Sequence, residues 1–262
     1  MSAASDFTAR YGPWAVIAGA SEGIGAAFAA QLADRGLNLI LVARRSGPLE
    51  ELAARMPTTA VTVAADLATP EGLDAVASAV GDREIGLVVA NAALSPGGRF
   101  IEMDPALLLR VLDLNCRAPL MLAHRFLPAM AARGRGGFVV MSSLAGMQGS
   151  PPFTTYAATK AFGAVLAEGL WAELRGSGVD VLACVAGAVA TPGFDRSTVK
   201  RAPGTVSAEL VAATALRRLG HGPRTVPGLV SRASSVLMSR LLPRRAAISI
   251  IHKASSGLLP QD

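Results

Sequence analysis

The sequence is short of cysteine, aromatic residues and long apolar runs. Only two of its 262 residues are cysteines, and aromatic residues make up 5%. We expect Cys116 and Cys184 to be reduced core thiols, one in a helix and one in a buried strand, which excludes a fold built on disulfides. Because 51% of the residues are hydrophobic and few are aromatic, alanine, leucine and valine must supply most of the core.

Other absences exclude further classes of protein. No apolar run reaches the roughly 20 residues of a membrane-spanning helix. The N-terminus, Met-Ser-Ala-Ala-Ser-Asp, lacks the basic start and the apolar stretch of a secretory signal. The three histidines are far apart in the sequence and show no metal-ligand spacing, so no metal site is expected. Together with the reduced thiols, these absences predict a cytoplasmic protein.

The charge is distributed unevenly along the chain. The net charge is +6, and residues 190–262 carry 11 Lys and Arg against 3 Asp and Glu, whereas residues 1–189 carry 14 against 16. A solvated surface is the simplest interpretation of the basic C-terminal quarter. A subunit contact, an acidic substrate or an anionic membrane surface are the alternatives. Nucleic acid is not expected as a partner, because basic and aromatic residues do not interleave.

Short apolar runs alternate with longer stretches of helical pattern. The runs are continuous, which is typical of strands covered on both faces in a parallel sheet. The alternation indicates one α/β domain over residues 1–262, with a doubly wound parallel sheet flanked by helices. The expected strands are 14–18, 37–42, 60–64, 86–90, 137–142 and 179–185, and the expected helices lie near 24–35, 47–55, 71–80, 105–133 and 155–176.

The pattern loosens after Val185. Residues 190–205 are rich in Gly, Pro, Thr and Ser and are expected to form a substrate loop. Ser207 is expected to cap a helix that ends near Leu219, and Arg224-Thr-Val-Pro to form a short final strand. Residues 229–262 are expected to form a helical C-terminal extension, with one or two amphipathic helices broken at Pro243.

A glycine-rich turn follows the first expected strand and leads into a helix. It has the sequence Gly19-Ala-Ser-Glu-Gly-Ile-Gly25. Glycines let the backbone turn tightly and approach a pyrophosphate, and the helix N-terminus supplies N–H groups and partial positive charge. A purely structural turn is the alternative. The position between strand one and a helix favours a Rossmann-type dinucleotide site.

The second strand ends in Ala43-Arg44-Arg45, with no acidic residue at the turn. An acidic residue at this point binds the ribose 2′-hydroxyl of NAD, whereas the 2′-phosphate of NADP is accommodated by arginine. We therefore expect NADP(H) in preference to NAD(H), with a solvated arginine pair as the alternative. Asp66, which ends the third strand, is placed either to accept a hydrogen bond from the adenine amino group or simply to begin the next helix.

A candidate catalytic group lies further along. Tyr156 and Lys160 are four residues apart in an expected helix, hence on one face, and Ser143 precedes the tyrosine by thirteen residues. A free tyrosine has a pKa of about 10, and a neighbouring ammonium favours the phenolate. We expect Lys160 to lower the pKa of Tyr156 while the Ser143 hydroxyl holds the substrate oxygen. This arrangement predicts proton transfer at a carbonyl or an alcohol.

Six motifs occur in a fixed order along residues 12–192: the glycine turn, Asn91-Ala92, Asn115, Ser143, Tyr156-x-x-x-Lys160 and Thr191. In this order the chain resembles the short-chain dehydrogenase/reductase superfamily, in its compact single-domain branch. The glycine turn and the arginine pair are most similar to NADPH-using ketoreductases of that family.

The resemblance implies a role for each motif. Tyr156 would be the general acid/base, with Ser143 as the oxyanion donor, Lys160 on the nicotinamide ribose and Asn115 holding a proton-relay water. Asn91 and Ala92 would line the adenosine side, and Val189 and Thr191 the nicotinamide half. The cofactor residues so implied are Gly19, Ser21, Glu22, Gly23, Ile24, Gly25, Arg44, Arg45, Asp66, Leu67, Asn91, Ala92, Tyr156, Lys160, Val189 and Thr191.

Four alanines depart from the pattern usual in that family: Ala18, Ala90, Ala93 and Ala186. None of them removes a catalytic group. The changes at Ala18 and Ala90 alter a hydrogen-bonded contact between neighbouring loops, so modest cofactor affinity is expected.

The sequence thus predicts an NADP(H)-dependent oxidoreductase that interconverts a ketone or aldehyde and the corresponding alcohol. A nucleotide-recycling epimerase or dehydratase, and a non-catalytic NADP(H)-binding regulator, are the alternatives. We expect an apolar small-molecule substrate in a cleft walled by residues 94–100, 144–153 and 190–205. The apolar candidates on these walls are Leu94, Phe100, Leu144, Met147 and Phe153.

Two surfaces are expected to meet partners. Small residues on the helices near 105–133 and 155–176, together with the resemblance, imply a homodimer or homotetramer. The segment 236–245 is expected first to cover the substrate cleft, with a subunit contact or a membrane surface as alternatives.

Overall fold

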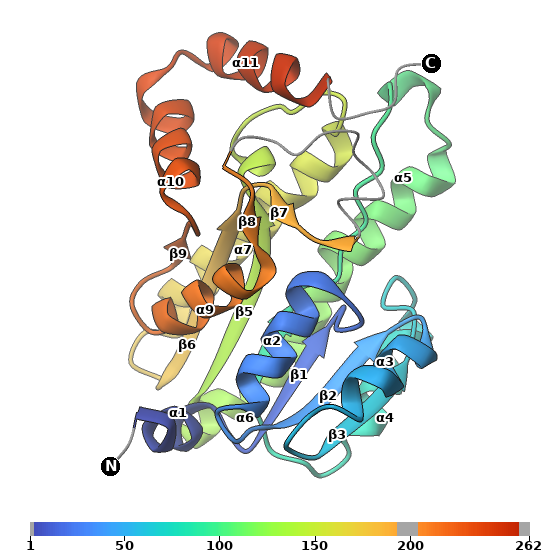
Figure 1. Cartoon of the computed structure of the whole chain (residues 1–262), viewed down its shortest axis with the longest axis vertical. Helices are drawn as coiled ribbons and strands as arrows, with labels where there is room; N and C mark the ends of the chain where they lie inside the picture. Colours follow the sequence, from blue (N-terminus) through green and yellow to red (C-terminus); the bar gives the residue numbers. More distant parts are fainter. Residues whose placement is uncertain (1–2, 193–203, 257–262) are drawn as a thin grey trace.

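The computed structural model describes residues 3–192 and 204–256. Its centre is a parallel sheet in the strand order β3-β2-β1-β4-β5-β6-β9 (Figure 1). The continuous apolar runs form these strands because each is covered on both faces. The strands are β1 (Trp14–Ala18), β2 (Asn38–Ala43), β3 (Ala60–Ala64), β4 (Ile85–Ala90), β5 (Gly136–Ser143), β6 (Val179–Ala186) and β9 (Arg224–Thr225). The order reverses at β1, which is the arrangement expected of a doubly wound sheet.

Helices cover both faces of the sheet and enclose two apolar cores (Figure 1). One core lies under α1 (Ala3–Tyr11), α2 (Gly23–Ala33), α3 (Ser46–Ala53) and α9 (Ala208–Arg218). The other lies under α4 (Pro70–Val80), α6 (Ala118–Arg133) and α7 (Thr154–Glu173). The predicted α/β class with a doubly wound parallel sheet is confirmed, and alanine, leucine and valine do dominate both cores.

Helix starts follow local capping chemistry. Thr69 accepts a hydrogen bond from Gly72 N before α4, and Asp104 accepts one from Ala106 N before α5 (Pro105–Leu112). Ser207 accepts one from Leu210 N before α9, so the cap predicted there is confirmed. The helix expected over 105–133 is interrupted by one turn of π-helix, η2 (Asp113–Arg117), which separates α5 from α6.

The C-terminal extension folds as helices broken near Pro243, as predicted. It consists of α10 (Leu229–Val236), a π-helical turn η4 (Leu237–Leu241) and α11 (Arg244–Ser256). In Figure 1 these helices project beyond the carboxyl ends of the strands. A second small sheet, β7 (Val189–Ala190) paired with β8 (Val206–Ser207), borders the expected substrate loop. Residues 193–203 of that loop lie outside the described residues.

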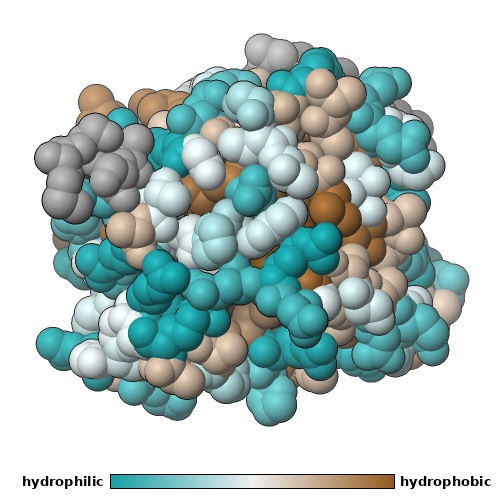
Figure 2. All heavy atoms as spheres, turned by 90° about the horizontal axis from the view of Figure 1, so that it is seen from below, coloured by the Kyte–Doolittle hydropathy of each residue, from teal (hydrophilic) through white to brown (hydrophobic). Residues whose placement is uncertain are grey.

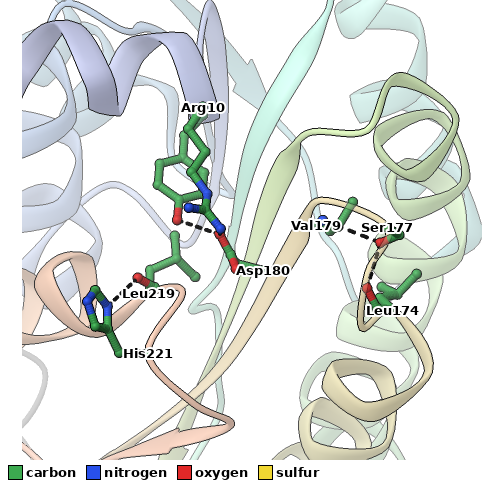
Figure 3. Close-up of polar contacts among 8 residues, drawn as sticks. Arg10, Leu174, Ser177, Val179, Asp180, Leu219 and His221 are labelled. Carbon is green, nitrogen blue, oxygen red and sulfur yellow. Dashed lines mark hydrogen bonds and ion pairs between the residues drawn. The ribbon is translucent and has the colours of Figure 1, made fainter.

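The N-terminal helix α1 was not expected from the sequence. The Tyr11 hydroxyl donates to Asp180 at 2.6 Å, and Arg10 pairs with the same carboxylate at 2.6 Å, which attaches α1 to β6 (Figure 3). This attachment lies at the amino ends of the strands. Figure 2 shows the molecule from that end, where hydrophilic and neutral residues cover most of the surface. Within the described residues, no helix has the length and apolar character needed to cross a membrane.

Candidate active site

A crevice of about 1110 Å³ lies beyond the carboxyl ends of the strands. One end of it is lined by the glycine turn, and the middle by Ser143, Tyr156 and Lys160. The other end is lined by residues of α10, η4 and α11, among them Ser231, Met238 and Ile251. The carboxyl edge of a doubly wound sheet is where such folds bind their ligands.

The glycine turn is held in place by backbone packing that excludes larger residues. Gly19 has φ +79°, and a Cβ there would lie 2.8 Å from Ala92 Cα. Gly23 has φ +57°, and its Cβ would lie 2.9 Å from Thr191 Cγ2. At Gly25 an added Cβ would lie 2.0 Å from Gly19 O. The first turn of α2 therefore packs against the strand-to-helix bend and leaves room beside its N-terminus, a cradle that fits a pyrophosphate. Ser21, Glu22 and Ile24 of this turn also line the crevice.

The end of β2 presents the arginine pair to the same crevice. Arg44 and Arg45 are both exposed and both line it. Arg45 pairs with Glu22 at 3.1 Å, an interaction across the crevice wall that the sequence did not predict. A guanidinium has five N–H donors, so this pair leaves donors for a phosphate.

Asp66 is already engaged in the structure. Its carboxylate accepts from Ala68 N at 3.1 Å and from Arg110 at 2.5 Å. Burial raises the pKa of Asp66, but these two donors and the positive charges of Arg110 and Arg44 outweigh it, so the pKa lies below its usual value. A carboxylate can accept about four hydrogen bonds, so Asp66 retains the capacity to accept the predicted one from an adenine amino group. Leu67, the next residue, is buried and lines the crevice.

Asn91 connects two neighbouring loops. Ala18 and Ala90 were expected to alter the hydrogen-bonded contact between these loops. Its backbone N–H donates to Ala18 O at 3.2 Å, and its side-chain amide donates to Gly19 O at 2.9 Å. Together with the packing of Ala92 on Gly19, these bonds connect the turn after β4 to the glycine turn. The adenosine side of the crevice therefore keeps a hydrogen-bonded wall despite Ala18 and Ala90.

Ser143, Tyr156 and Lys160 lie together at the centre of the crevice. Ser143 ends β5, and Tyr156 and Lys160 occupy consecutive turns of α7 on one face, as predicted. The helix α7 packs closely on β5 and on the turn that follows it: Ser142 Oγ donates to Lys160 O at 2.7 Å, and a Cβ on Gly146 in that turn would lie 2.6 Å from Ala161 N.

The electrostatics of this group differ from the sequence prediction. Burial raises the pKa of Tyr156, and the Ser143 hydroxyl lowers it by less, so the pKa lies above its usual value. The predicted lowering is therefore wrong for the structure as it stands. Burial also lowers the pKa of Lys160 to about 8. Lys160 Nζ donates to Met141 O at 2.9 Å and lies 5.6 Å from the centre of the Tyr156 ring, so it faces the ring and not the hydroxyl.

Asn115 is buried in the π-helical turn η2, and its side chain is fully engaged. Its Oδ1 accepts from Leu94 N at 2.8 Å, while its Nδ2 donates to Leu94 O at 2.9 Å and to Thr159 Oγ1 at 3.0 Å. Thr159 Oγ1 donates in turn to Tyr156 O at 2.7 Å. The side chain therefore ties the Leu94 wall to α7. The water-holding role that the resemblance implies for Asn115 stays a prediction.

Thr159 is the residue of this network that sequence reasoning missed. It lies three residues after Tyr156 and next to Lys160, on the face of α7 that packs against η2. The sequence did contain a signal for it, because a residue three positions after Tyr156 lies next to the tyrosine on the helix surface.

The nicotinamide side and the substrate walls are partly as predicted. Val189, in β7, and Thr191 line the crevice, as do Leu94, Leu144, Met147 and Phe153. Phe100 is a correction: it lies in the short helix η1 (Phe100–Glu102), is 54% exposed and does not line the crevice. Phe194, the phenylalanine of the expected wall 190–205, falls outside the described residues. Gln148 and Ser150 line the crevice from the predicted wall 144–153. Four serines of the C-terminal helices were not predicted as lining residues: Ser231, Ser234, Ser235 and Ser255.

A doubly wound sheet with a glycine cradle and a Ser-Tyr-Lys group at its carboxyl edge defines a dinucleotide-dependent oxidoreductase. The sequence model of the short chain dehydrogenase family matches residues 13–202, and the chain belongs to that family. The protein is thus an oxidoreductase that acts on CH–OH groups and their carbonyl counterparts with a nicotinamide dinucleotide.

Individual relatives cover most of the chain. It is 32% identical over 247 residues to hydroxysteroid dehydrogenase-like protein 1 of Gallus gallus, which covers 91% of this chain and 74% of the relative. A solved 7beta-hydroxysteroid dehydrogenase superposes with a TM-score of 0.87 at 25% identity, covering 94% of this chain and 98% of the other. A short-chain dehydrogenase from Sphingobium yanoikuyae, solved in complex with NADPH, gives a TM-score of 0.78 at 31% identity and covers 88% and 96%.

Proposed function

We propose that the protein is an NADP(H)-dependent oxidoreductase that interconverts a bulky, mostly apolar ketone and its secondary alcohol. The observation that carries this proposal is the shape of the crevice. Its volume of about 1110 Å³ extends from the glycine turn, past Tyr156, to the apolar side chains of the C-terminal helices. A dinucleotide and a large substrate fit end to end in such a space, with the tyrosine hydroxyl between them.

The residues supply the acid–base chemistry. The raised pKa keeps the Tyr156 phenol protonated at neutral pH, so it is poised to give a proton to a carbonyl oxygen. The Ser143 hydroxyl, beside the phenol, holds the same oxygen and stabilises its developing negative charge. When bound, the nicotinamide supplies the hydride. Lys160 holds positive charge at the centre of the crevice at pH values below about 8.

The arginine pair supports NADP(H) over NAD(H). Arg44 and Arg45 are exposed on the crevice wall at the end of β2, where the chain itself supplies two arginines and no acidic residue, and the nearby Glu22 carboxylate is paired with Arg45. The ion pair with Glu22 already restricts the Arg45 side chain before any ligand binds. Arg45 therefore loses less conformational freedom when a phosphate binds. The similar dehydrogenase solved with NADPH supports the same cofactor.

The substrate end supports a large molecule with a few polar groups. Leu94, Leu144, Met147 and Phe153 form one apolar side, and Met238 and Ile251 of the extension form the other. Serine hydroxyls between them offer hydrogen bonds at a distance from the reacting oxygen. The similar 7beta-hydroxysteroid dehydrogenase of solved structure supports a polycyclic, hydroxylated substrate of this kind.

Exposed apolar residues support assembly into a homo-oligomer. They lie on α5, α6 and α7, the helices expected to meet a second copy. Among them Leu109 is 61% and Val165 is 63% exposed. A contact over these helices would bury them and leave the crevice accessible.

The test combines cofactor titration with a substrate panel. We expect tighter binding of NADPH than NADH, and at least a tenfold loss of NADPH affinity with little change for NADH in an Arg44→Ser, Arg45→Ser double variant. With NADPH, keto-steroids should be reduced faster than small ketones such as acetone. Tyr156→Phe should bind NADPH normally and lose at least a thousandfold in turnover. Tighter NADH binding would refute the cofactor, and full activity in Tyr156→Phe would refute the mechanism.

A further inference from the structure

The first helix of the C-terminal extension carries its apolar side chains on the outside. Leu229 is 81% exposed, Leu241 is 69% exposed, and Val230, Val236 and Leu237 are also exposed. The residues that line the crevice from the same segment are Val230, Ser231, Ser234, Ser235 and Met238, so three of the five are serines. A helix that covers the core of a protein normally buries its apolar stripe and exposes its polar one. In α10 and η4, by contrast, three serines line the crevice while Leu229, Leu237 and Leu241 are exposed.

Within residues 229–256 of the extension, every charged residue is basic. Between residues 210 and 261 the sequence has no aspartate or glutamate. The cations on the extension are exposed and flank the apolar side chains on the same helices and on the turn between them: Arg232, Arg240, Arg244, Arg245 and Lys253. The combination of exposed leucine and arginine without acidic residues is the pattern of a helix that lies at an anionic lipid interface.

The extension is attached to the wall of the crevice, so the outer face is fixed relative to the site. Arg244 Nη1 donates to Met147 O at 2.8 Å, and Ser235 Oγ donates to Met147 Sδ at 3.4 Å. Met147 is itself a lining residue of the crevice.

We propose that the outer face of α10 and η4, together with the arginines at the start of α11, binds the surface of an anionic phospholipid membrane. The leucine and valine side chains enter the boundary between headgroups and acyl chains, and the guanidiniums bind the lipid phosphates. A second copy of this chain fits the face less well, because a two-fold contact would set arginines against arginines with no carboxylate between them. The crevice would then lie next to the bilayer, where apolar substrates dissolve.

The experiment measures flotation of the full chain with vesicles. We expect binding to phosphatidylcholine vesicles that contain about a third phosphatidylglycerol, and no binding to pure phosphatidylcholine. Leu237→Gln with Leu241→Gln should weaken binding at least tenfold, because both side chains lose their contact with the acyl region. Arg240→Gln with Arg245→Gln should weaken it by about fivefold for each arginine removed. Raising the salt concentration should act in the same direction.

Matched controls lie elsewhere on the surface. Ile101→Gln removes a side chain that is 80% exposed, and Arg55→Gln removes an exposed arginine of the nucleotide half. Both should bind vesicles as the unaltered chain does, and circular dichroism should show every variant folded. Equal binding to neutral vesicles would overturn the proposal. Unchanged vesicle binding by the Leu237→Gln, Leu241→Gln double variant would also overturn it. A third contrary outcome is that the unaltered chain forms an oligomer and does not bind vesicles, while the double variant is monomeric.

Discussion

Lys160 faces the ring of Tyr156 from one turn away, with Nζ 5.6 Å from the ring centre, and directs its hydrogen bond to Met141 O at 2.9 Å. The ammonium is therefore held by the backbone of β5 and lies over the face of the tyrosine ring at cation–π distance. Because the surrounding protein shields both groups from water and so disfavours their charged forms, the pKa of the phenol lies above its usual value and the pKa of the amine lies below it. Each group is thus biased toward its neutral form.

Stability should rise when the buried amine is removed. Between pH 8 and 10.5 the folded chain binds fewer protons at Lys160 than the unfolded chain does, so its stability rises with pH over that range. Below pH 8 the penalty is fully present, on the order of 3 kcal/mol. We expect Lys160→Met to be about 1 to 3 kcal/mol more stable at pH 7, with the gain shrinking toward pH 10.5. Urea unfolding at both pH values measures this, and a gain independent of pH would contradict it.

Ser143 should set the pH at which the alcohol is oxidised. Its hydroxyl lowers the pKa of Tyr156 against the effect of burial, so Ser143→Ala should raise that pKa further. Oxidation needs the phenolate, and its rate profile should move to higher pH, with kcat/KM lower by roughly a hundredfold. Profiles of both reaction directions provide the measurement. An unchanged midpoint would mean that a different group titrates.

Asn115 should matter for folding as well as for activity. Asn115→Ala leaves Leu94 N and Leu94 O without their partner inside the protein, which should destabilise the fold by about 2 to 4 kcal/mol. The control is Asn38→Ala, because Asn38 Oδ1 accepts a single bond from Thr59 N at 3.2 Å and its loss should cost under about 1 kcal/mol. Thermal unfolding compares the two. Equal losses would show that the Asn115 network adds nothing.

Two glycine-to-alanine changes should have opposite effects. At Gly25 the new methyl group would meet Gly19 O at 2.0 Å, so the cradle must open and dinucleotide affinity should fall by at least tenfold. At Gly169, in an exposed turn of α7, nothing lies within 4 Å, and alanine should stabilise the helix by roughly 1 kcal/mol. Titration with NADPH and thermal unfolding of both variants test this. Normal affinity in Gly25→Ala would mean that the turn does not hold the cofactor.

Tyr11→Phe should lower stability without changing turnover. The Tyr11 hydroxyl is bonded to Asp180 at the amino ends of the strands, at the opposite end of the sheet from the crevice. Loss of a hydrogen bond to a charged acceptor should cost about 1 to 3 kcal/mol. Unfolding and steady-state kinetics on the same preparation separate the two effects. A large fall in kcat with no loss of stability would contradict this assignment.

Much of the site could be predicted because its parts are local. The glycine spacing, the capping serine before α9 and the four-residue spacing of Tyr156 and Lys160 depend on neighbours in the chain, and the structure has each of them as predicted. The apolar runs gave the strands to within one residue at most ends, because only strands covered on both faces need such runs.

The helix α1 and the surface position of Phe100 were not predictable in this way. The attachment of α1 depends on Asp180, which lies 169 residues from Tyr11, and no local pattern reports such a contact. Phe100 is apolar, as a residue on the wall of the substrate cleft is expected to be, but it lies in the short helix η1 and is exposed to solvent.

The sequence by itself determined the order of strands and helices, the dinucleotide cradle and the set of residues offered for proton transfer, since all of these follow from periodicity and spacing along the chain. Only the tertiary structure decided how those residues are used. It occupied the amide of Asn115 with Leu94 and Thr159, reversed the expected shift of the Tyr156 pKa, paired Arg45 with Glu22 and left the leucines of α10 and η4 exposed. The reason is physical: burial and long-range contacts set hydrogen-bond partners and pKa values, and both arise only when distant segments pack together.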